Sequence, residues 1–175
     1  MMIFRTGLRL VTVADEVAQT ISSFSRRPEN SREAGGILVG SYRGPHIQVA
    51  SCSGPMARDR RKATLFDRCD PGHQEFALKN WRNSAQTKTF VGEWHTHPEP
   101  QPSPSRLDLQ TWRHVAGNNT AGNTVFLIRG YECWWAGLAI GNILVPMSII
   151  SQAGDEASGY YPENAATKSQ LVKQP

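Results

Sequence analysis

Apolar residues follow two different periods along this chain. Where apolar and polar residues alternate, or where short apolar runs are bounded by Gly, Pro or Asn, the pattern predicts β-strands. The predicted strands are residues 8–13, 33–40, 46–51, 90–97, 124–129, 133–140 and 143–150. Apolar residues three or four positions apart predict three helices, which begin near Asp15, His73 and Ser105. Strands and helices therefore follow one another along most of the chain, and the last three strands suit a meander.

Three stretches have neither period. Residues 54–72 are rich in charge and have Gly or Pro near both ends, so we expect most of this segment to be a loop, and long loops are often functional. Residues 98–104 contain four prolines, which predict a rigid connector. Polar and small residues dominate residues 151–175. This composition predicts a mobile tail that follows a single domain over residues 1–150.

The composition is typical of a globular protein. Of the 175 residues, 39% are hydrophobic and 19% are charged, which lies far from the composition of disordered proteins. No apolar run approaches the roughly 20 residues that span a bilayer, and no signal-peptide core is visible, so we expect neither membrane insertion nor export. Three scattered cysteines form neither a Cys-x-x-Cys pair nor a disulfide framework. They predict a reducing, cytoplasmic location.

The net charge of +4 excludes little by itself. The basic residues between Arg58 and Lys62 either attract an acidic partner or belong to a solvated loop, and the sequence leaves both interpretations open. The five tryptophans are not interleaved with basic residues in the way that single-strand binders require. We therefore expect no nucleic-acid partner.

Two histidines stand two positions apart on the strand predicted over residues 90–97. Side chains at this spacing point to the same side of a sheet, so His95 and His97 present two imidazoles at one place. The short proline connector brings the start of the next helix, with Asp108, back beside the end of the strand. Two histidines, an aspartate and a water make a catalytic zinc site. Glu33, at the start of a glycine-rich strand, is the best candidate for its general base.

These residues and their spacing resemble the JAMM motif of the JAB/MPN (Mov34, PAD-1) metalloprotease family. The residues that carry the resemblance are Glu33, His95, His97, Pro98, Ser105 and Asp108. The resemblance covers most of the chain and implies an α/β (α+β) domain with a mixed β-sheet flanked by helices, in a cytidine-deaminase-like layout. It also implies a Zn²⁺ ion held by both histidines and the aspartate. Glu33 would be the general base, and Ser105 would help to stabilise the tetrahedral intermediate.

Within that family, the segments EAGGILVG and GEWHTHPEPQPSPSRLD look most like small bacterial members encoded beside ubiquitin-activating-like and ubiquitin-conjugating-like proteins. The deconjugating peptidases of type II CBASS antiphage operons are the best-understood examples. This resemblance implies a zinc isopeptidase that acts on a cGAS-like cyclic-oligonucleotide synthase joined through its C-terminal tail to a target lysine. E1-like and E2-like conjugation proteins are the other implied partners. The alternatives are a catalytically idle MPN scaffold, an amidase, and a deconjugase of another ubiquitin-like pathway.

Each candidate residue also has an ordinary structural interpretation. A His-x-His pair occurs on protein surfaces without a metal. The segment that starts at Ser105 is also a plausible capping box, although a carboxylate bound to zinc is not free to cap. Glu33 is alternatively an exposed acid paired with Arg32 or Arg43. Glu93 shares the parity of the two histidines, so it either supports them or forms a salt bridge.

Overall fold

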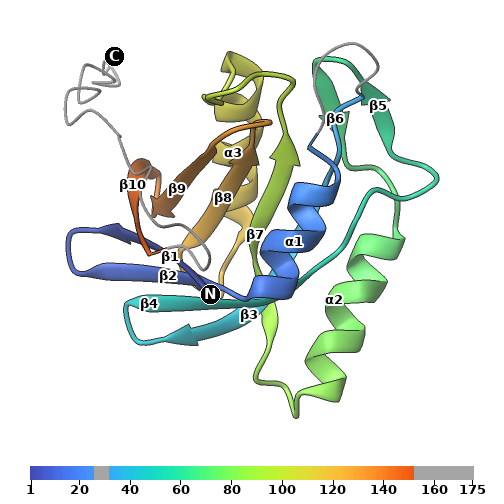
Figure 1. The fold of residues 1–175 in the computed structure, drawn as a ribbon. Coiled ribbons are helices and arrows are strands. Elements are labelled where there is room, and N and C mark those ends of the chain that lie inside the picture. The colour runs from blue at the N-terminus through green and yellow to red at the C-terminus, as the bar shows by residue number, and fades with distance from the viewer. Residues whose placement is uncertain (26–31, 152–175) are drawn as a thin grey trace, which may run out of the picture.

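A computed structural model describes residues 1–25 and 32–151 of the chain (Figure 1). Its strands are β1 (Met2–Thr6), β2 (Arg9–Val13), β3 (Gly35–Arg43), β4 (His46–Cys52), β5 (Arg60–Lys62), β6 (Leu65–Asp67), β7 (Thr89–Thr96), β8 (Thr124–Arg129), β9 (Trp134–Ile140) and β10 (Ile143–Ser151). Its helices are α1 (Asp15–Ser23), α2 (Gly72–Asn83) and α3 (Arg106–Asn118). The tail predicted after residue 150 lies outside the described residues, except for Ser151. Among the described helices, none is long and apolar enough to cross a membrane.

All seven predicted strands and all three predicted helices are present, and the mixed α+β fold class is confirmed. Two predictions were incomplete. β1 was missed, because the turn at Gly7 (φ +53°) separates it from β2 and places Leu8, which the prediction put in a strand, at an exposed position. The segment 54–72 is mostly loop and turn as expected, but β5 and β6, of three residues each, pair within it as a small hairpin. Their short, charged sequence carries no period that could have predicted them.

Eight strands form a closed barrel in the order β1-β10-β9-β8-β7-β3-β4-β2, and β1 pairs with β2 to complete it. The pairs β2–β4 and β7–β8 are parallel, and the other pairs are antiparallel, so the sheet is mixed as expected. The predicted meander is confirmed in β8, β9 and β10. Closure removes free edges from the barrel. The separate β5–β6 sheet, by contrast, has only two strands and so keeps its outer edges.

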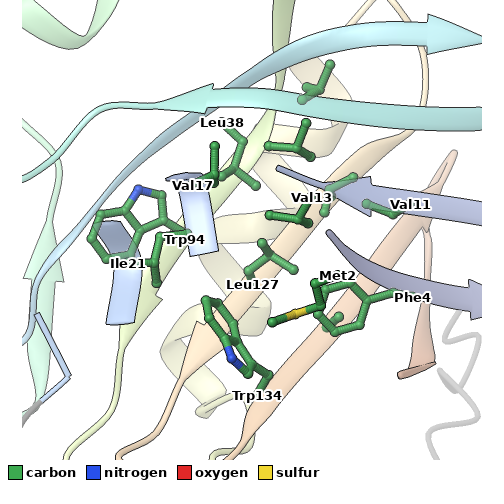
Figure 2. Packing of buried hydrophobic residues seen from close by; sticks show 14 of the residues in the cluster. Met2, Phe4, Val11, Val13, Val17, Ile21, Leu38, Trp94, Leu127 and Trp134 are labelled. Atoms are coloured by element: carbon green, nitrogen blue, oxygen red, sulfur yellow. The ribbon is translucent and has the colours of Figure 1, made fainter. Parts of the chain in front are cut away.

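The main core fills the interior of the barrel and the contact with α1 (Figure 2). Phe4, Val11 and Leu38 are fully buried there, together with Ile21 of the helix. Each such side chain contributes roughly 1.5–3 kcal/mol through removal of apolar surface from water. Trp94 of β7 belongs to the same cluster. The strand that carries both candidate histidines is therefore anchored in the best-packed part of the molecule.

A second, aromatic cluster holds α3 against the barrel. The ring of Trp112 stacks on Phe126 with centroids 4.4 Å apart and on Trp135 at 5.5 Å. Trp112 is 4% exposed, and it is the buried residue of this helix. Because Trp112 lies one turn after Asp108, this packing fixes where the Asp108 carboxylate lies.

The proline connector between β7 and α3 is braced by the turn that joins β8 to β9. The N–H groups of Tyr131 and Cys133 donate to the carbonyl oxygens of Glu99 and Pro100, each over 2.9 Å. Gly130 permits this contact, because a Cβ at that position would lie 2.4 Å from the Glu99 oxygen. The connector is therefore irregular but held, and it returns the chain from the end of β7 to the start of α3.

Candidate metal centre

His95 and His97 lie at the end of β7 and face the same place. His95 pairs with Gly35 in the ladder between β7 and β3. On the other side of β7, the His97 N–H donates to Arg129 O of β8 at 3.1 Å, just beyond the end of β7. Both side chains are buried, and their Nε2 atoms are 2.9 Å apart. The period of two therefore brings the imidazoles together as predicted.

Asp108, in the first turn of α3, faces both histidines. Its Oδ1 lies 3.4 Å from His95 Nε2, and its Oδ2 lies 3.4 Å from His97 Nε2. The same carboxylate also caps the helix, because Oδ2 accepts the Ser105 N–H at 2.7 Å while Ser105 Oγ accepts the Asp108 N–H at 3.1 Å. The carboxylate therefore both caps the helix and faces the metal position. A carboxylate has about four acceptor sites, enough for both.

The donor set and its spacing fit a zinc ion. Two ligands that are each about 2.0–2.1 Å from a tetrahedral ion lie about 3.3 Å apart. The two Nε2 atoms are 2.9 Å apart and each lies 3.4 Å from a different oxygen of Asp108, and one ligand atom from each of the three residues lies within 4.8 Å of the other two. Two imidazole nitrogens and one carboxylate oxygen are common ligands of catalytic zinc. Within residues 1–25 and 32–151, this is the cluster of His, Cys, Asp and Glu side chains close enough to hold a metal.

Glu33 lies immediately before β3 and is held by the β5–β6 hairpin. Its N–H donates to Lys62 O at 2.8 Å, Arg61 Nε donates to its carbonyl oxygen at 2.8 Å, and its carboxylate accepts the backbone N–H of Phe66. The residue is 7% exposed. The alternative that Glu33 is an exposed acid was therefore wrong. Gly35 lets the Phe66 ring approach closely, since a Cβ there would lie 2.3 Å from that ring.

Burial and mutual charge set the protonation of the site. Burial raises the pKa of Glu33 to about 7; His97 opposes this shift, and the charges of Asp108 and Glu99 reinforce it. Burial also opposes ionisation of Asp108, but hydrogen bonds from His95, His97 and Ser105 outweigh it and hold the Asp108 pKa well below its ordinary value. For His97, burial lowers the pKa, but bonds to Asp108 and Glu99 outweigh burial and raise it.

The buried Glu33 should destabilise the metal-free protein at alkaline pH. Its pKa is about 7 in the folded state and 4.5 in its ordinary state, so folding opposes ionisation. The cost is absent below pH 4.5 and reaches about 3 kcal/mol above pH 7. We expect Glu33→Gln to raise the free energy of unfolding at pH 8, with most of the gain lost by pH 5, in urea denaturation with a chelator present. A variant no more stable than wild type at pH 8 would contradict this expectation.

The two acids that flank the histidines, Glu93 and Glu99, have different partners. Glu93 forms an ion pair with Arg68, so its salt-bridge interpretation is confirmed. Glu99 was not assigned a role from the sequence, yet its Oε1 lies 2.8 Å from His97 Nδ1. A carboxylate on the second nitrogen of a metal-binding histidine is a common arrangement. In the sequence, Glu99 was visible only as an acid two residues after His97. The turn of the connector brings its carboxylate to His97 Nδ1.

The site lies in a groove of about 620 Å³ between the β5–β6 hairpin and α3. The hairpin contributes residues 64–67 to one wall, and α3 contributes Leu107, Thr111 and Val115 to the other. Glu33, both histidines, Ser105 and Asp108 all line the same groove. All five predicted site residues are therefore brought together.

Comparison with known proteins gives the family. The model of prokaryotic homologs of the JAB domain matches residues 16–152. The chain belongs to this family. Among curated proteins, this prokaryotic JAB-domain chain is 36% identical over 107 residues to a "CD-NTase/cGAS isopeptidase" of Pseudomonas aeruginosa, covering 61% of this chain and 68% of the relative. It is 33% identical over 132 residues to a protein of the same name from Escherichia coli, covering 75% and 83%.

A solved structure shows the same fold. The solution structure of protein DSY2949 from Desulfitobacterium hafniense superposes with a TM-score of 0.57 at 20% identity. The superposition covers 78% of this chain and 88% of that one. The JAB-domain architecture described above therefore occurs in a distant sequence.

Proposed function

We propose that this chain is a zinc-dependent isopeptidase that releases a conjugated protein from a lysine side chain of its target. The observation that carries the proposal is the convergence of His95, His97 and Asp108 beside the buried Glu33 in one groove. The isopeptidase names of the curated relatives support the same class of reaction.

Three residues would hold the ion, and a fourth would orient one of these ligands. His95 and His97 offer Nε2, and Asp108 offers a carboxylate oxygen. A zinc ion bound there supplies a Lewis acid beside the scissile carbonyl. Glu99 accepts a hydrogen bond from His97 Nδ1 and so leaves Nε2 as the ligand atom.

Glu33 transfers the proton, and Ser105 stabilises the negative charge that develops on the oxyanion. The Glu33 carboxylate takes a proton from the attacking water and delivers it to the lysine nitrogen as the amide C–N bond breaks. The products are a free carboxyl group on one protein and a free amine on the other. Ser105 Oγ accepts the Asp108 N–H, and its own proton donates to the oxyanion.

The released protein in this proposal is a cGAS-like cyclic-oligonucleotide synthase. The names of the relatives support this assignment. E1-like and E2-like proteins of the same pathway would form the conjugate that the chain cleaves. The reaction would take place in the cytoplasm, where the free thiols of Cys52, Cys69 and Cys133 stay reduced.

Specificity should lie in the C-terminal tail of the synthase, because the conjugates share that tail and differ in their targets. β6 lines the groove and belongs to a two-stranded sheet, so an extended tail can add a strand to its edge. Apolar side chains of Leu65, Leu107 and Val115 lie along the same groove. Backbone hydrogen bonds to the hairpin would supply affinity, and these apolar side chains would determine which tail sequences bind.

Exchange of the two sides of the scissile bond tests this function. A fusion of a synthase tail to a reporter protein should be cleaved at the end of the tail by the zinc-loaded protein. We expect exchange of the tail to abolish cleavage, and exchange of the reporter to change the rate little. Cleavage that follows the reporter and ignores the tail would contradict the deconjugase assignment and favour a general endopeptidase or amidase.

A further inference from the structure

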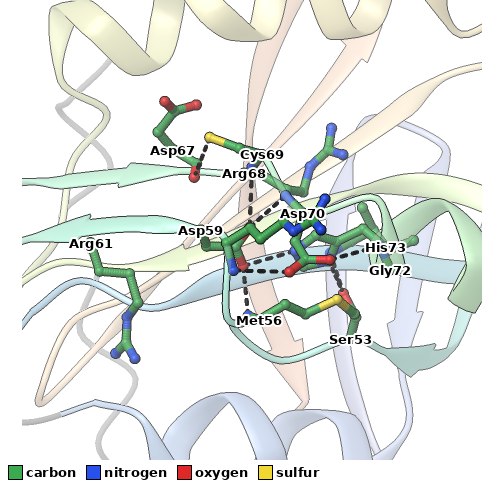
Figure 3. Close-up of polar contacts among 12 residues, drawn as sticks. Ser53, Met56, Asp59, Arg61, Asp67, Arg68, Cys69, Asp70, Gly72 and His73 are labelled. Atoms are coloured by element: carbon green, nitrogen blue, oxygen red, sulfur yellow. Dashed lines mark hydrogen bonds and ion pairs between the residues drawn. The ribbon is translucent and has the colours of Figure 1, made fainter.

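A second cluster of polar side chains lies behind the β5–β6 hairpin, outside the groove (Figure 3). Ser53 follows β4, Asp59 precedes β5, and His73 lies in the first turn of α2. Ser53 Oγ is 2.7 Å from His73 Nδ1, and His73 Nε2 is 2.9 Å from Asp59 Oδ2. Ser53 is 3% exposed, and the side chains of His73 and Asp59 are 1% and 0% exposed. We call these three residues the bracket.

The bracket has the residue types of a nucleophilic triad but cannot act as one. Ser53 Oγ accepts the Ile37 N–H at 3.0 Å and has no access to solvent. Asp59 Oδ2 already accepts the Met56 N–H, so the ring proton of His73 must lie on Nε2 to donate to that oxygen. Nδ1 is then an acceptor for the Ser53 hydroxyl. Each donor along the bracket therefore faces an acceptor. A buried network in which every polar group has a partner is rigid.

Asp59 ties together the two ends of the segment that carries the hairpin. Its Oδ2 accepts the Met56 N–H at 2.7 Å before β5, and its Oδ1 accepts the N–H groups of Cys69 and Asp70, each at 3.1 Å, after β6. Burial opposes ionisation of Asp59, but bonds from Met56, His73 and Asp70 outweigh it and lower the Asp59 pKa. The charged carboxylate is thus the common acceptor at the base of the hairpin.

The hairpin in turn holds Glu33 from three directions. Lys62 O accepts its N–H, Arg61 donates to its carbonyl oxygen, and the Phe66 N–H binds its carboxylate. Ser53 also contacts β7, because its carbonyl oxygen accepts the Trp94 indole N–H at 2.9 Å. Trp94 immediately precedes His95. The bracket therefore supports both the hairpin that holds Glu33 and the strand that holds the histidines.

We propose that Ser53, Asp59 and His73 are positioning residues of the reaction, which hold the β5–β6 hairpin so that it places the Glu33 carboxylate toward the candidate metal centre. This inference rests on the proposed function for its effect on rate. The part of the inference that concerns structure, namely that the bracket holds the hairpin and Glu33 in place, does not depend on the proposed function. Misplacement of a catalytic group by about 1 Å can lower a rate by about a hundredfold.

Asp59→Asn, with Glu75→Gln as its matched control, tests the bracket. The amide keeps one oxygen for the N–H groups of Cys69 and Asp70 but turns an NH₂ toward the Met56 N–H and His73. Glu75 is an exposed acid in the first turn of α2, two residues after His73, and its side chain points to solvent rather than to the hairpin. His73→Leu removes both ring bonds at similar volume, and His73→Gln restores one donor and one acceptor.

Two readouts are measured on each folded variant. Amide hydrogen exchange by NMR reports the Glu33 and Phe66 N–H groups, in the protein with and without zinc. Turnover of the tail-reporter fusion is measured per zinc-loaded molecule. We expect Asp59→Asn and His73→Leu to speed exchange at both amides by about tenfold or more while exchange in β8 stays unchanged. We expect kcat to fall by about tenfold to a hundredfold, His73→Gln to recover most of the loss, and Glu75→Gln to behave as wild type.

Different results separate the two proposals. Unchanged exchange at Glu33 and Phe66 in the bracket variants would overturn the bracket, whatever the activity. Faster exchange with unchanged kcat would overturn its catalytic role. If the wild-type protein does not cleave the fusion, the proposed function fails, and the exchange experiment still decides whether the bracket holds the hairpin. Should Asp59→Asn not fold, His73→Leu is judged by the same two readouts.

Discussion

Replacement of Glu33 by Gln is expected to leave a folded protein that binds zinc but turns over its substrate several orders of magnitude more slowly. Gln keeps the size of the side chain and an oxygen for the Phe66 N–H, so the hairpin contact survives. It cannot take a proton, and general-base catalysis is lost together with the delivery of that proton to the leaving amine. Cleavage of the tail-reporter fusion under single-turnover conditions, with zinc content measured on the same sample, checks this result.

Glu16→Gln is the matched control for this experiment. Glu16 is an exposed acid in the first turn of α1, away from the groove. We expect its variant to cleave at the wild-type rate. Equal rates for wild type and Glu33→Gln would contradict the enzyme assignment, and a wild-type protein with no activity at all would favour a scaffold that only binds partners.

Loss of any one of the three metal-facing side chains is expected to weaken zinc binding by more than about a hundredfold, because removal of even an outer-shell partner costs about 10 to 100-fold. Wild type should hold about one zinc per chain. His97→Ala should also abolish turnover. Zinc titration against a competing chelator measures the affinity, and metal analysis of the purified protein measures the stoichiometry.

Asp108 needs a variant that separates its two contacts. Asp108→Ala removes the helix cap as well as the metal-facing oxygen, so loss of zinc could follow from a frayed helix. Asp108→Asn keeps an oxygen for the Ser105 N–H, but it loses the charge and places an NH₂ group where the other oxygen faced His95. We expect this variant to keep the thermal stability of the metal-free protein and to lose zinc. His114→Ala, at an exposed histidine of the same helix, should bind zinc as wild type does. Undiminished zinc binding by His97→Ala would mean that the ligand set is wrong.

Much of the candidate site was predictable because its signals are local. Two histidines at a period of two on a strand must share a face, and a helix that begins nine residues after His97 can start near the strand end. The strands with long apolar runs, such as β3 and β8, were also predictable, because burial on both sides requires such runs. The three missed strands are short, and β5 and β6, at three residues each, are too short for a period to show.

By itself, the sequence determined the order of most elements, the three metal-facing residues and the candidate base, since spacing and residue chemistry suffice for these. Only the tertiary structure decided the closure of the sheet into a barrel, because β1 and β2 meet strands that lie far away in the chain. It also decided the contact of Glu99 with His97 and the bracket behind the hairpin, whose members Ser53, Asp59 and His73 have no motif spacing. Their roles come from burial, which forces every polar group to find a partner and so makes distant side chains act together.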